Sequence, residues 1–341
     1  MQHHNKHHKA RGIILAAIAL ILIVTGICVI FLSRRPMPIQ QTTATPSRQA
    51  QSSAFSADSA YRYIAEQVAF GPRTPGSEAH RDCGDYLTRK MRSFGAEVSE
   101  QQADIRTWDG KTYPMRNIIA SFQPEQRQRV LLFAHWDCRP WSDTEQERSQ
   151  QFKPVLGAND GASGVAVLME IARQLGQFAH LPIGIDIIFF DLEDYGVPDW
   201  EKDVQDSWCL GSQYWAQHPH KAGYSANYGI LLDMVGTQGA CFMWEYFSKR
   251  YAPHVLYQVW NKAQDLGYGR FFVQSDGGIL TDDHLYINRL AGIPCIDIID
   301  FDNDRGGFFE GWHSQRDDMR HIDQATLQAV GETLLSVLLS E

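Results

Sequence analysis

An apolar run that ends in carboxylates constrains the fold of this chain more than any other stretch. Residues 187–190 read Ile-Ile-Phe-Phe, which is a segment of strand length and strand composition, and Asp191, Glu193 and Asp194 follow directly. In open α/β sheets the ligand crevice lies just outside the carboxyl ends of the strands. We therefore expect Glu193 and Asp194 at the edge of a buried sheet, where a ligand would bind.

A glycine-rich turn over residues 157–164 opens a helical pattern at 165–175 and puts Asp160 beside a helix start. Apolar segments of strand length alternate with helical patterns along the rest of the chain. Strands that alternate with helices of ten or more residues predict an α/β domain with a largely parallel sheet, covered by helices on both faces. Further strands are predicted at 117–122, 130–134, 229–232 and 293–299, and further helices begin near 58, 77, 212, 253 and 323.

Composition excludes several other classes of protein. The 341 residues are 44% apolar and 11% aromatic, which is typical of a globular core and not of a disordered chain. A formal charge of −9, with no basic patch, argues against binding to nucleic acid. None of the six cysteines forms a CxxC pair, so a zinc ribbon is excluded.

The N-terminal region has the pattern of a membrane anchor. Residues 13–32 carry no charge and just reach the length of about 20 residues that a bilayer requires. A cleaved signal peptide is the alternative, but Ser33-Arg34-Arg35-Pro36 follows where small residues are expected. We predict a cytoplasmic n-region at 1–12, a transmembrane signal anchor at 13–32, a flexible linker at 33–54 and a catalytic domain at 55–341. This domain is expected on the periplasmic side of a bacterial inner membrane.

Five segments bring potential metal ligands to the ends of strands, the starts of helices or the loops between them. They carry His135, Asp160, Glu193 with Asp194, Asp233 and His313. A catalytic zinc ion takes three nitrogen or oxygen ligands and keeps one position open for water or substrate. More acids and histidines are present than one zinc ion requires, so one acid remains available as a base.

Six motifs, taken together and in this order, resemble those of the zinc aminopeptidase clan, and within it those of the glutaminyl-peptide cyclotransferase (glutaminyl cyclase) family. The resemblance extends from Ala54 to the C-terminus and implies a single α/β domain with a central mixed sheet and one zinc ion per chain. The motifs are Ala134-His135-Trp136-Asp137, Gly157 to Gly164, Phe189 to Asp194, Leu231-Leu232-Asp233, Asp282-Asp283-His284 and Trp312-His313.

The resemblance also implies roles for individual residues. Zinc would be held by Asp160, Asp194 and His313, and Glu193 would be the general acid/base. Asp233 and Asp282 would complete the hydrogen-bond network around this acid/base. The substrate pocket would be lined by Trp200, Trp312 and His135. The sequence departs from the animal enzymes in two places: Asp194 stands where they carry glutamate, and the segment around Trp200 is longer, which leaves Trp208 as an alternative pocket residue.

The function implied is conversion of the N-terminal glutamine of peptides and proteins to pyroglutamate with release of ammonia, an aminoacyltransferase reaction. The alternative is a dinuclear aminopeptidase, in which His135 and Asp233 would help to hold a second zinc ion. A third interpretation is a membrane-tethered binding module that has lost its metal. Trp312 before His313 and the paired acids before His284 favour the cyclase. Asp302, Asp304, Asp317 and Asp318 flank the segment that carries His313; a solvated acidic loop is the default interpretation, and support of the metal ligands by some of them is the alternative.

Overall fold

The computed structural model describes residues 55–181 and 183–340. The n-region, anchor and linker predicted over 1–54 lie outside these residues. Within the described part of the chain, no helix is both long enough and apolar enough to cross a membrane.

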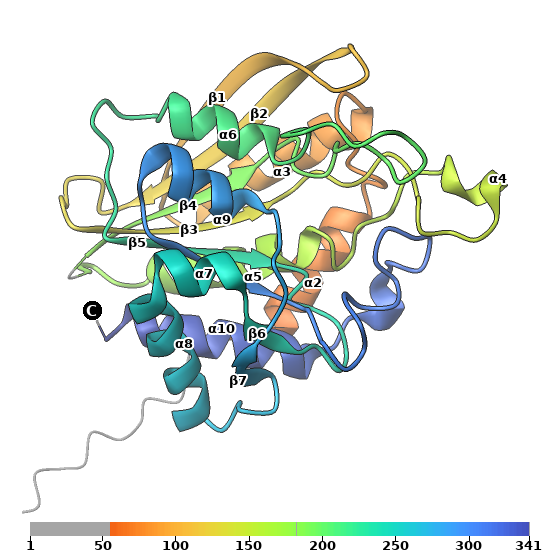
Figure 1. The fold of residues 1–341 in the computed structure, drawn as a ribbon. Coiled ribbons are helices and arrows are strands. Elements are labelled where there is room, and N and C mark those ends of the chain that lie inside the picture. Colours follow the sequence, from red (N-terminus) through yellow and green to blue (C-terminus); the bar gives the residue numbers. More distant parts are fainter. Residues whose placement is uncertain (1–54, 182, 341) are drawn as a thin grey trace, which may run out of the picture. The chain divides into compact units, whose positions relative to one another are not determined.

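The centre of the domain is a six-stranded mixed sheet (Figure 1). Its order is β1-β2-β4-β3-β5-β8. β1 pairs antiparallel with β2, and β2 pairs antiparallel with β4, whereas the pairs β4–β3, β3–β5 and β5–β8 are parallel. The strands are β1 (Glu97–Arg106), β2 (Thr112–Phe122), β3 (Arg129–His135), β4 (Gly184–Phe190), β5 (Tyr228–Asp233) and β8 (Cys295–Ile299). The predicted mixed sheet is confirmed.

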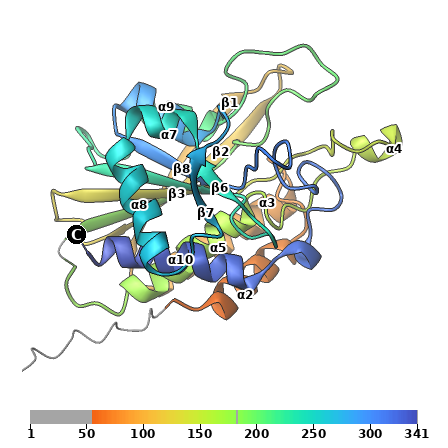
Figure 2. The same ribbon diagram turned by 60° about the horizontal axis from the view of Figure 1, so that its bottom comes forward.

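Helices cover both faces of this sheet, as Figures 1 and 2 show from two directions. One face carries α2 (Ala57–Val68), α3 (Glu78–Ser93), α5 (Ala162–Leu175), α8 (Pro253–Asp265) and α10 (Gln324–Leu338). The other carries α6 (Leu210–Gln217), α9 (Asp283–Tyr286) and η1 (Ile287–Ala291). The remaining elements are α4 (Arg148–Gln151), α7 (Tyr246–Tyr251), η2 (Met319–His321) and the two-stranded pair β6 (Phe242–Trp244) and β7 (Phe272–Asp276).

Side chains of the central strands alternate between two apolar cores. In β3, Val130 and Leu132 pack with the helices of the first face, and Leu131 and Phe133 pack with α6 and η1. Successive residues of a strand point to opposite faces, so a strand that is covered on both sides is largely apolar. The central strands follow this rule, with the buried Asp186 of β4 and Asp297 of β8 as exceptions.

β1 was not predicted. Its sequence, Glu-Val-Ser-Glu-Gln-Gln-Ala-Asp-Ile-Arg, carries few large apolar residues. As the edge strand it pairs only with β2, over ten residues from Glu97 to Arg106, and none of its side chains is fully buried. Its strand structure therefore depends mainly on hydrogen bonds to β2, with a smaller contribution from the half-buried Val98, Ala103 and Ile105.

Candidate active site and metal centre

The predicted site residues meet at the carboxyl edge of the parallel strands. β3 ends at His135, β5 ends at Asp233, and Glu193 and Asp194 follow the last residue of β4. The turn that carries Asp160 lies against the same edge because Gly164, in the first turn of α5, lets the helix approach β5. A Cβ atom at Gly164 would lie 2.2 Å from the carbonyl oxygen of Leu232.

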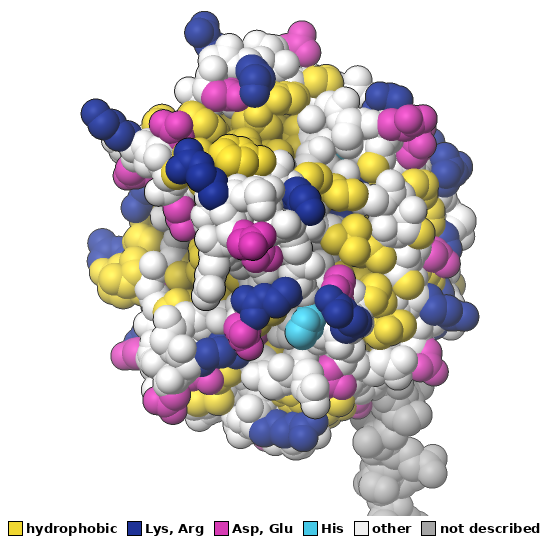
Figure 3. Space-filling view, turned by 90° about the vertical axis from the view of Figure 1, so that its right-hand side faces the viewer, with side chains coloured by type: hydrophobic (Ala, Val, Ile, Leu, Met, Phe, Trp, Pro, Cys, Tyr) yellow, Lys and Arg dark blue, Asp and Glu magenta, His cyan; other side chains and the backbone are white. Residues whose placement is uncertain are grey.

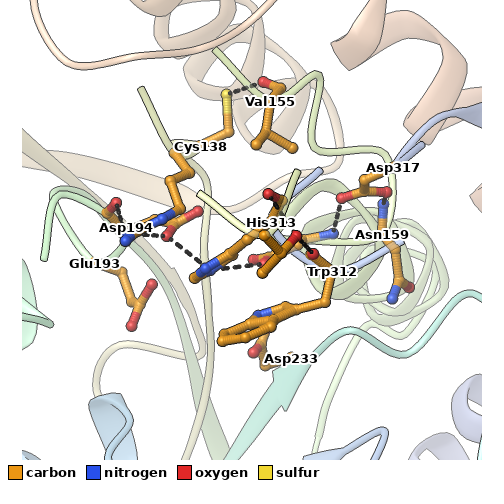
Figure 4. Close-up of polar contacts among 12 residues, drawn as sticks. Cys138, Val155, Asn159, Glu193, Asp194, Asp233, Trp312, His313 and Asp317 are labelled. Atoms are coloured by element: carbon orange, nitrogen blue, oxygen red, sulfur yellow. Dashed lines mark hydrogen bonds and ion pairs between the residues drawn. The ribbon is translucent and has the colours of Figure 1, made fainter. Parts of the chain in front are cut away.

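Asp160, Asp194 and His313 form a buried cluster. One potential ligand atom from each lies within 4.8 Å of the other two. Nε2 of His313 is 3.3 Å from Oδ1 of Asp194 and 3.7 Å from Oδ2 of Asp160. Figure 4 shows the side chains of Asp194 and His313 directed at each other, with Glu193 and Asp233 nearby. The structure therefore brings together the three residues that were predicted as metal ligands.

This cluster fits a zinc ion. Two carboxylates and one imidazole are donors that zinc prefers, and three protein ligands leave one position open toward a substrate. The imidazole is also oriented for this purpose, since Nδ1 of His313 lies 3.4 Å from Oδ1 of Asp143 and Nε2 is left to face the two carboxylates. A carboxylate on the far ring nitrogen is the usual support of a metal-binding histidine.

Two other buried carboxylates hold the main chain on which the acidic residues sit. Asp137 accepts hydrogen bonds from the backbone N–H groups of Glu193 and Asp194, at 3.1 and 3.2 Å. Asp317 accepts from those of Asn159 and Asp160, at 2.7 and 3.0 Å, as Figure 4 shows. The prediction that Asp317 belongs to a solvated loop is therefore wrong: it is fully buried because it anchors the turn that carries Asp160.

Glu193 lies next to the cluster without belonging to it. The residue is 9% exposed, and Oε1 accepts a hydrogen bond from Sγ of Cys209 at 3.2 Å. Burial raises the pKa of Glu193 well above its ordinary value; His135 opposes the shift, and Asp282 adds to it. A carboxyl group with a raised pKa keeps its proton to a higher pH than an ordinary one, and a carboxyl group placed beside a reacting centre can both accept and donate a proton.

Asp282 and Asp233 lie in the same cavity as Glu193. The pKa of Asp282 is well above its ordinary value because the group is buried and faces Asp233. His135 was predicted to line the substrate pocket but lies behind it: Nε2 is 2.9 Å from Oδ1 of Asp160 and 3.2 Å from Oδ1 of Asp233. These three residues form a second set of potential metal ligands.

The cavity itself has a volume of about 250 Å³. Two tryptophans form walls beside His313: the ring of Trp312 stacks on the imidazole at 3.8 Å, and the ring of Trp208 lies parallel to it at 5.9 Å. Its lining residues are Asp160, Glu193, Trp208, Asp233, Met234, Ile279, Leu280, Thr281, Asp282, Ile299, Phe308, Trp312 and His313. The cavity thus joins a polar, acidic floor to apolar walls.

Trp200, which was predicted to line the pocket, is not among these residues. Its ring contacts Phe152 and Trp141, and the side chain is 37% exposed. Phe152 directly follows α4, which projects from one side of the molecule. Apolar side chains gather in places on the surface of that side (Figure 3). Trp208 takes the pocket position because Gly196 has no Cβ, which would otherwise lie 1.9 Å from the indole ring.

A larger hollow, of about 560 Å³, lies beside α3 and the β1–β2 pair. It is lined by His80 and Arg116 among others, and His80 is already held by Asp191 at 2.8 Å. None of the potential metal-ligand sets found in the described residues lines it. The smaller cavity is therefore the one with catalytic potential.

Sequence reasoning did not identify Asp143 or Arg139 as part of the site. Both are buried in the loop that follows β3, and Arg139 pairs with Asp143. Although burial opposes ionisation, the hydrogen bonds from Arg139 hold the pKa of Asp143 well below its ordinary value. No local sequence pattern distinguishes this pair from charged residues at the surface. Only the burial of the pair beside Asp194 and His313 shows that it belongs to the site.

Comparison with known proteins shows which family and which solved structures the chain resembles. Residues 117–338 match the family model "Peptidase family M28". The solved glutaminyl cyclase of Porphyromonas gingivalis is 55% identical, with a TM-score of 0.81 over 83% of this chain and 98% of that chain. A zinc-dependent exopeptidase from Parabacteroides distasonis is 52% identical, with a TM-score of 0.83 over 84% of this chain and 99% of that one.

Among curated proteins, aminopeptidase YwaD of Bacillus subtilis is 24% identical over 280 residues, which are 78% of this chain. The match spans only about half of that protein, 53% of its length. The family model covers well over half of the present chain, and the chain covers nearly the whole of both solved structures. This chain belongs to peptidase family M28.

Proposed function

We propose that this protein is a zinc-dependent glutaminyl cyclase, which converts N-terminal glutamine of peptides and proteins to pyroglutamate and ammonia. One observation carries the proposal: a carboxyl group with a raised pKa, Glu193, lies in a small cavity beside a three-residue zinc set without being part of it. The 55% identity to a solved glutaminyl cyclase supports the same activity.

The reaction forms one bond and breaks one. The α-amine of the substrate attacks the carbon of its own γ-amide, a five-membered lactam closes, and the amide nitrogen leaves as ammonia. A zinc ion held by Asp160, Asp194 and His313 would act as a Lewis acid on the γ-carbonyl group. Glu193 would take a proton from the attacking amine and return it to the departing nitrogen, so that no net proton is consumed.

Asp282 and Asp233 would support Glu193 in this role. Asp282 adds to the raised pKa of Glu193, and Asp233 in turn adds to that of Asp282. Their carboxyl groups line the cavity, where they can accept hydrogen bonds from the amine and amide N–H groups of the substrate. The acids would therefore hold the reacting nitrogens close to Glu193.

Trp208 and Trp312 would give the substrate its shape. Their rings stand beside His313 and leave a narrow apolar space above the acidic floor. A side chain confined there must fold back on its own amine, and holding reactants in a near-attack geometry accounts for a large share of the rate of ring closure.

A dinuclear aminopeptidase is the second candidate. It is favoured by the set His135, Asp160 and Asp233, whose ligand atoms also lie within 4.8 Å of one another. With a second zinc ion in that set, Glu193 would activate water for peptide-bond cleavage, and the first residue of the peptide would be released.

Metal content and reaction products separate the two functions. We expect one zinc ion per chain in residues 54–341, and ammonia release from a Gln-initiated peptide with every peptide bond intact. Glu193→Gln should keep the zinc ion and lower the rate by about 10²- to 10⁴-fold, the usual contribution of general acid–base catalysis. Two metal ions per chain together with a freed N-terminal residue would contradict the cyclase.

We also propose that residues 13–32 anchor the enzyme in a membrane, with the catalytic domain outside the cytoplasm. The proposal rests on the uncharged length of this segment and on the polar linker that follows it. Peptides with exposed N-terminal glutamine in the periplasm would then be the substrates.

A further inference from the structure

Arg139 is a fully buried arginine behind the proposed zinc site. It forms a two-point ion pair with Asp143, which is buried as well: Nε donates to Oδ1 at 2.8 Å, and Nη2 donates to Oδ2. A buried guanidinium is costly unless its donors are satisfied and its charge is paired. A group of this kind beside a metal site therefore calls for an explanation.

This ion pair contacts two of the three proposed zinc ligands. Nη1 of Arg139 donates to the main-chain oxygen of Asp194 at 3.2 Å and lies 3.4 Å from its Oδ1. Oδ1 of Asp143 lies 3.4 Å from Nδ1 of His313. Asp194 and His313 are 119 positions apart in the chain, so the Arg139–Asp143 pair is a direct link between them.

The surroundings fix the guanidinium plane. Trp208 and Trp141 lie over it, with centroids 4.4 and 5.4 Å from Cζ of Arg139. Nη1 and Nη2 also reach the main-chain oxygens of Gly196 and Val197, each at 3.4 Å. Only the planar, five-donor fork of arginine can serve so many acceptors at once.

The same loop also holds the main chain of His313. The backbone N–H and the hydroxyl group of Thr144, the residue after Asp143, donate to the carbonyl oxygen of His313 at 3.3 and 2.9 Å. His313 has a left-handed backbone with a φ of 51°. This conformation is rare for a residue with a side chain, so the loop must fix it from outside.

We propose that Arg139 and Asp143 are positioning residues that hold Asp194 and His313 in the geometry that zinc requires. Aspartate has a short side chain, so the place of its carboxylate follows closely from the place of its main chain, which Arg139 holds through the carbonyl oxygen. The charge of Arg139 also offsets part of the repulsion between the buried carboxylates. This inference rests on the proposed zinc site but not on the identity of the reaction.

The test is the zinc affinity of Arg139→Lys, measured by competition with a chelator of known affinity. Lysine keeps the positive charge but cannot reach Asp143 and Asp194 together. We expect its dissociation constant for zinc to rise by about 10- to 100-fold, as for other residues that support metal ligands. Asp143→Asn, which has nearly the same volume, should weaken zinc binding in the same direction.

Arg129→Lys is the matched control. Arg129 is also buried and pairs with a buried aspartate, Asp186, at 2.5 Å. It lies at the first residue of β3, at the opposite end of the strand from His135. This variant should lose stability without a change in the zinc dissociation constant.

Thermal unfolding with and without zinc completes the test. If Arg139 is a positioning residue, Arg139→Lys should reduce the rise in Tm that zinc produces. If Arg139→Lys and Asp143→Asn lower Tm as Arg129→Lys does, while their zinc dissociation constants stay within about twofold of the parent, the pair is merely structural and the inference is overturned. Because zinc binding is measured without substrate, absence of ammonia release would count against the proposed function alone.

Discussion

Two tryptophans eight positions apart illustrate how a residue obtains its role from its surroundings. Trp208 faces His313 on one side of the cavity and contacts Arg139 as well. Trp200 contacts Phe152 and Trp141 and is partly exposed. Both are large aromatic groups in one loop, yet of the two only Trp208 lines the cavity.

This difference predicts a difference in kinetics. Trp208→Ala should lower kcat/KM for a Gln-initiated peptide by about tenfold, which corresponds to about 1.4 kcal/mol of lost contact in the transition state. Trp200→Ala should stay within about twofold of the parent. The zinc content of both variants must be measured alongside, since Trp208 also contacts Arg139. Equal losses in the two variants would argue against a wall formed by Trp208.

The family resemblance pointed to three residues that the structure brings into one cluster, Asp160, Asp194 and His313, but not to the groups that support them. Asp160 lies in a glycine-rich turn and Asp194 follows a buried strand, so the local pattern already locates these two at the sheet edge. Arg139 and Asp317 carry no such signal, because a buried charge and a solvated charge have the same sequence signature. The choice between Trp200 and Trp208 depended on the course of a loop, which the backbone at Gly196 decides.

At the level of elements, prediction succeeded where burial on both faces produces continuous apolar runs. β3, β4, β5 and β8 were all anticipated at least in part, and they are the strands that position the site. β1 was missed because an edge strand needs no apolar alternation when its hydrogen bonds to β2 suffice. β1 lies at the edge of the sheet opposite to β8. Missing this strand therefore did not affect the prediction of the site residues.

One element contributes a pH dependence that is separate from the active site. Trp215 of α6 donates its indole N–H to Nδ1 of His220 at 3.1 Å. Burial lowers the pKa of His220 from 6.5 to about 4. Between these two values the unfolded chain binds a proton that the folded chain does not bind. The free energy of unfolding therefore falls as the pH drops from about 6.5 to about 4, and this contribution does not change further below that range.

His220→Asn tests this contribution, because the asparagine side chain can still accept the indole hydrogen bond but does not titrate. We expect the variant to lose less stability than the parent on acidification, by about 1–2 kcal/mol once solvent screening at this partly exposed site is allowed for. Urea unfolding of both chains at pH 7 and pH 4.5 measures the difference. Parallel stability profiles for the two proteins would exclude His220 as the source.

At the scale of the whole molecule, the site is assembled from segments that are spread over much of the described domain. Its residues come from the ends of β3, β4 and β5, from the turn before α5 and from the loops that carry Asp282 and His313. They span residues 135 to 313, which is most of the length matched by the family model. Partial unfolding of any of these segments would remove a ligand or a wall.

The proposed membrane anchor predicts how the full chain behaves when cells are fractionated. The full chain should sediment with membranes and be released by detergent but not by high salt, because an apolar helix and not surface charge would hold it. A chain that begins at residue 55 should be recovered without detergent and should retain the same zinc content. If the chain expressed from the full-length sequence is instead recovered in the soluble fraction and is shortened at its N-terminus, the segment is a cleaved signal peptide.

The two buried carboxylates under the site also have an evolutionary consequence. Asp137 accepts hydrogen bonds from the backbone N–H groups of residues 193 and 194, and Asp317 from those of residues 159 and 160. These hydrogen bonds do not involve the side chains at the four positions. This support of the two loops therefore does not depend on the side chains at 193–194 and 159–160. Substitutions at these positions can alter the metal count or the attacking group without first destroying the scaffold, so one ancestral backbone could give rise both to enzymes that cut peptides and to enzymes that close a ring at their N-terminus.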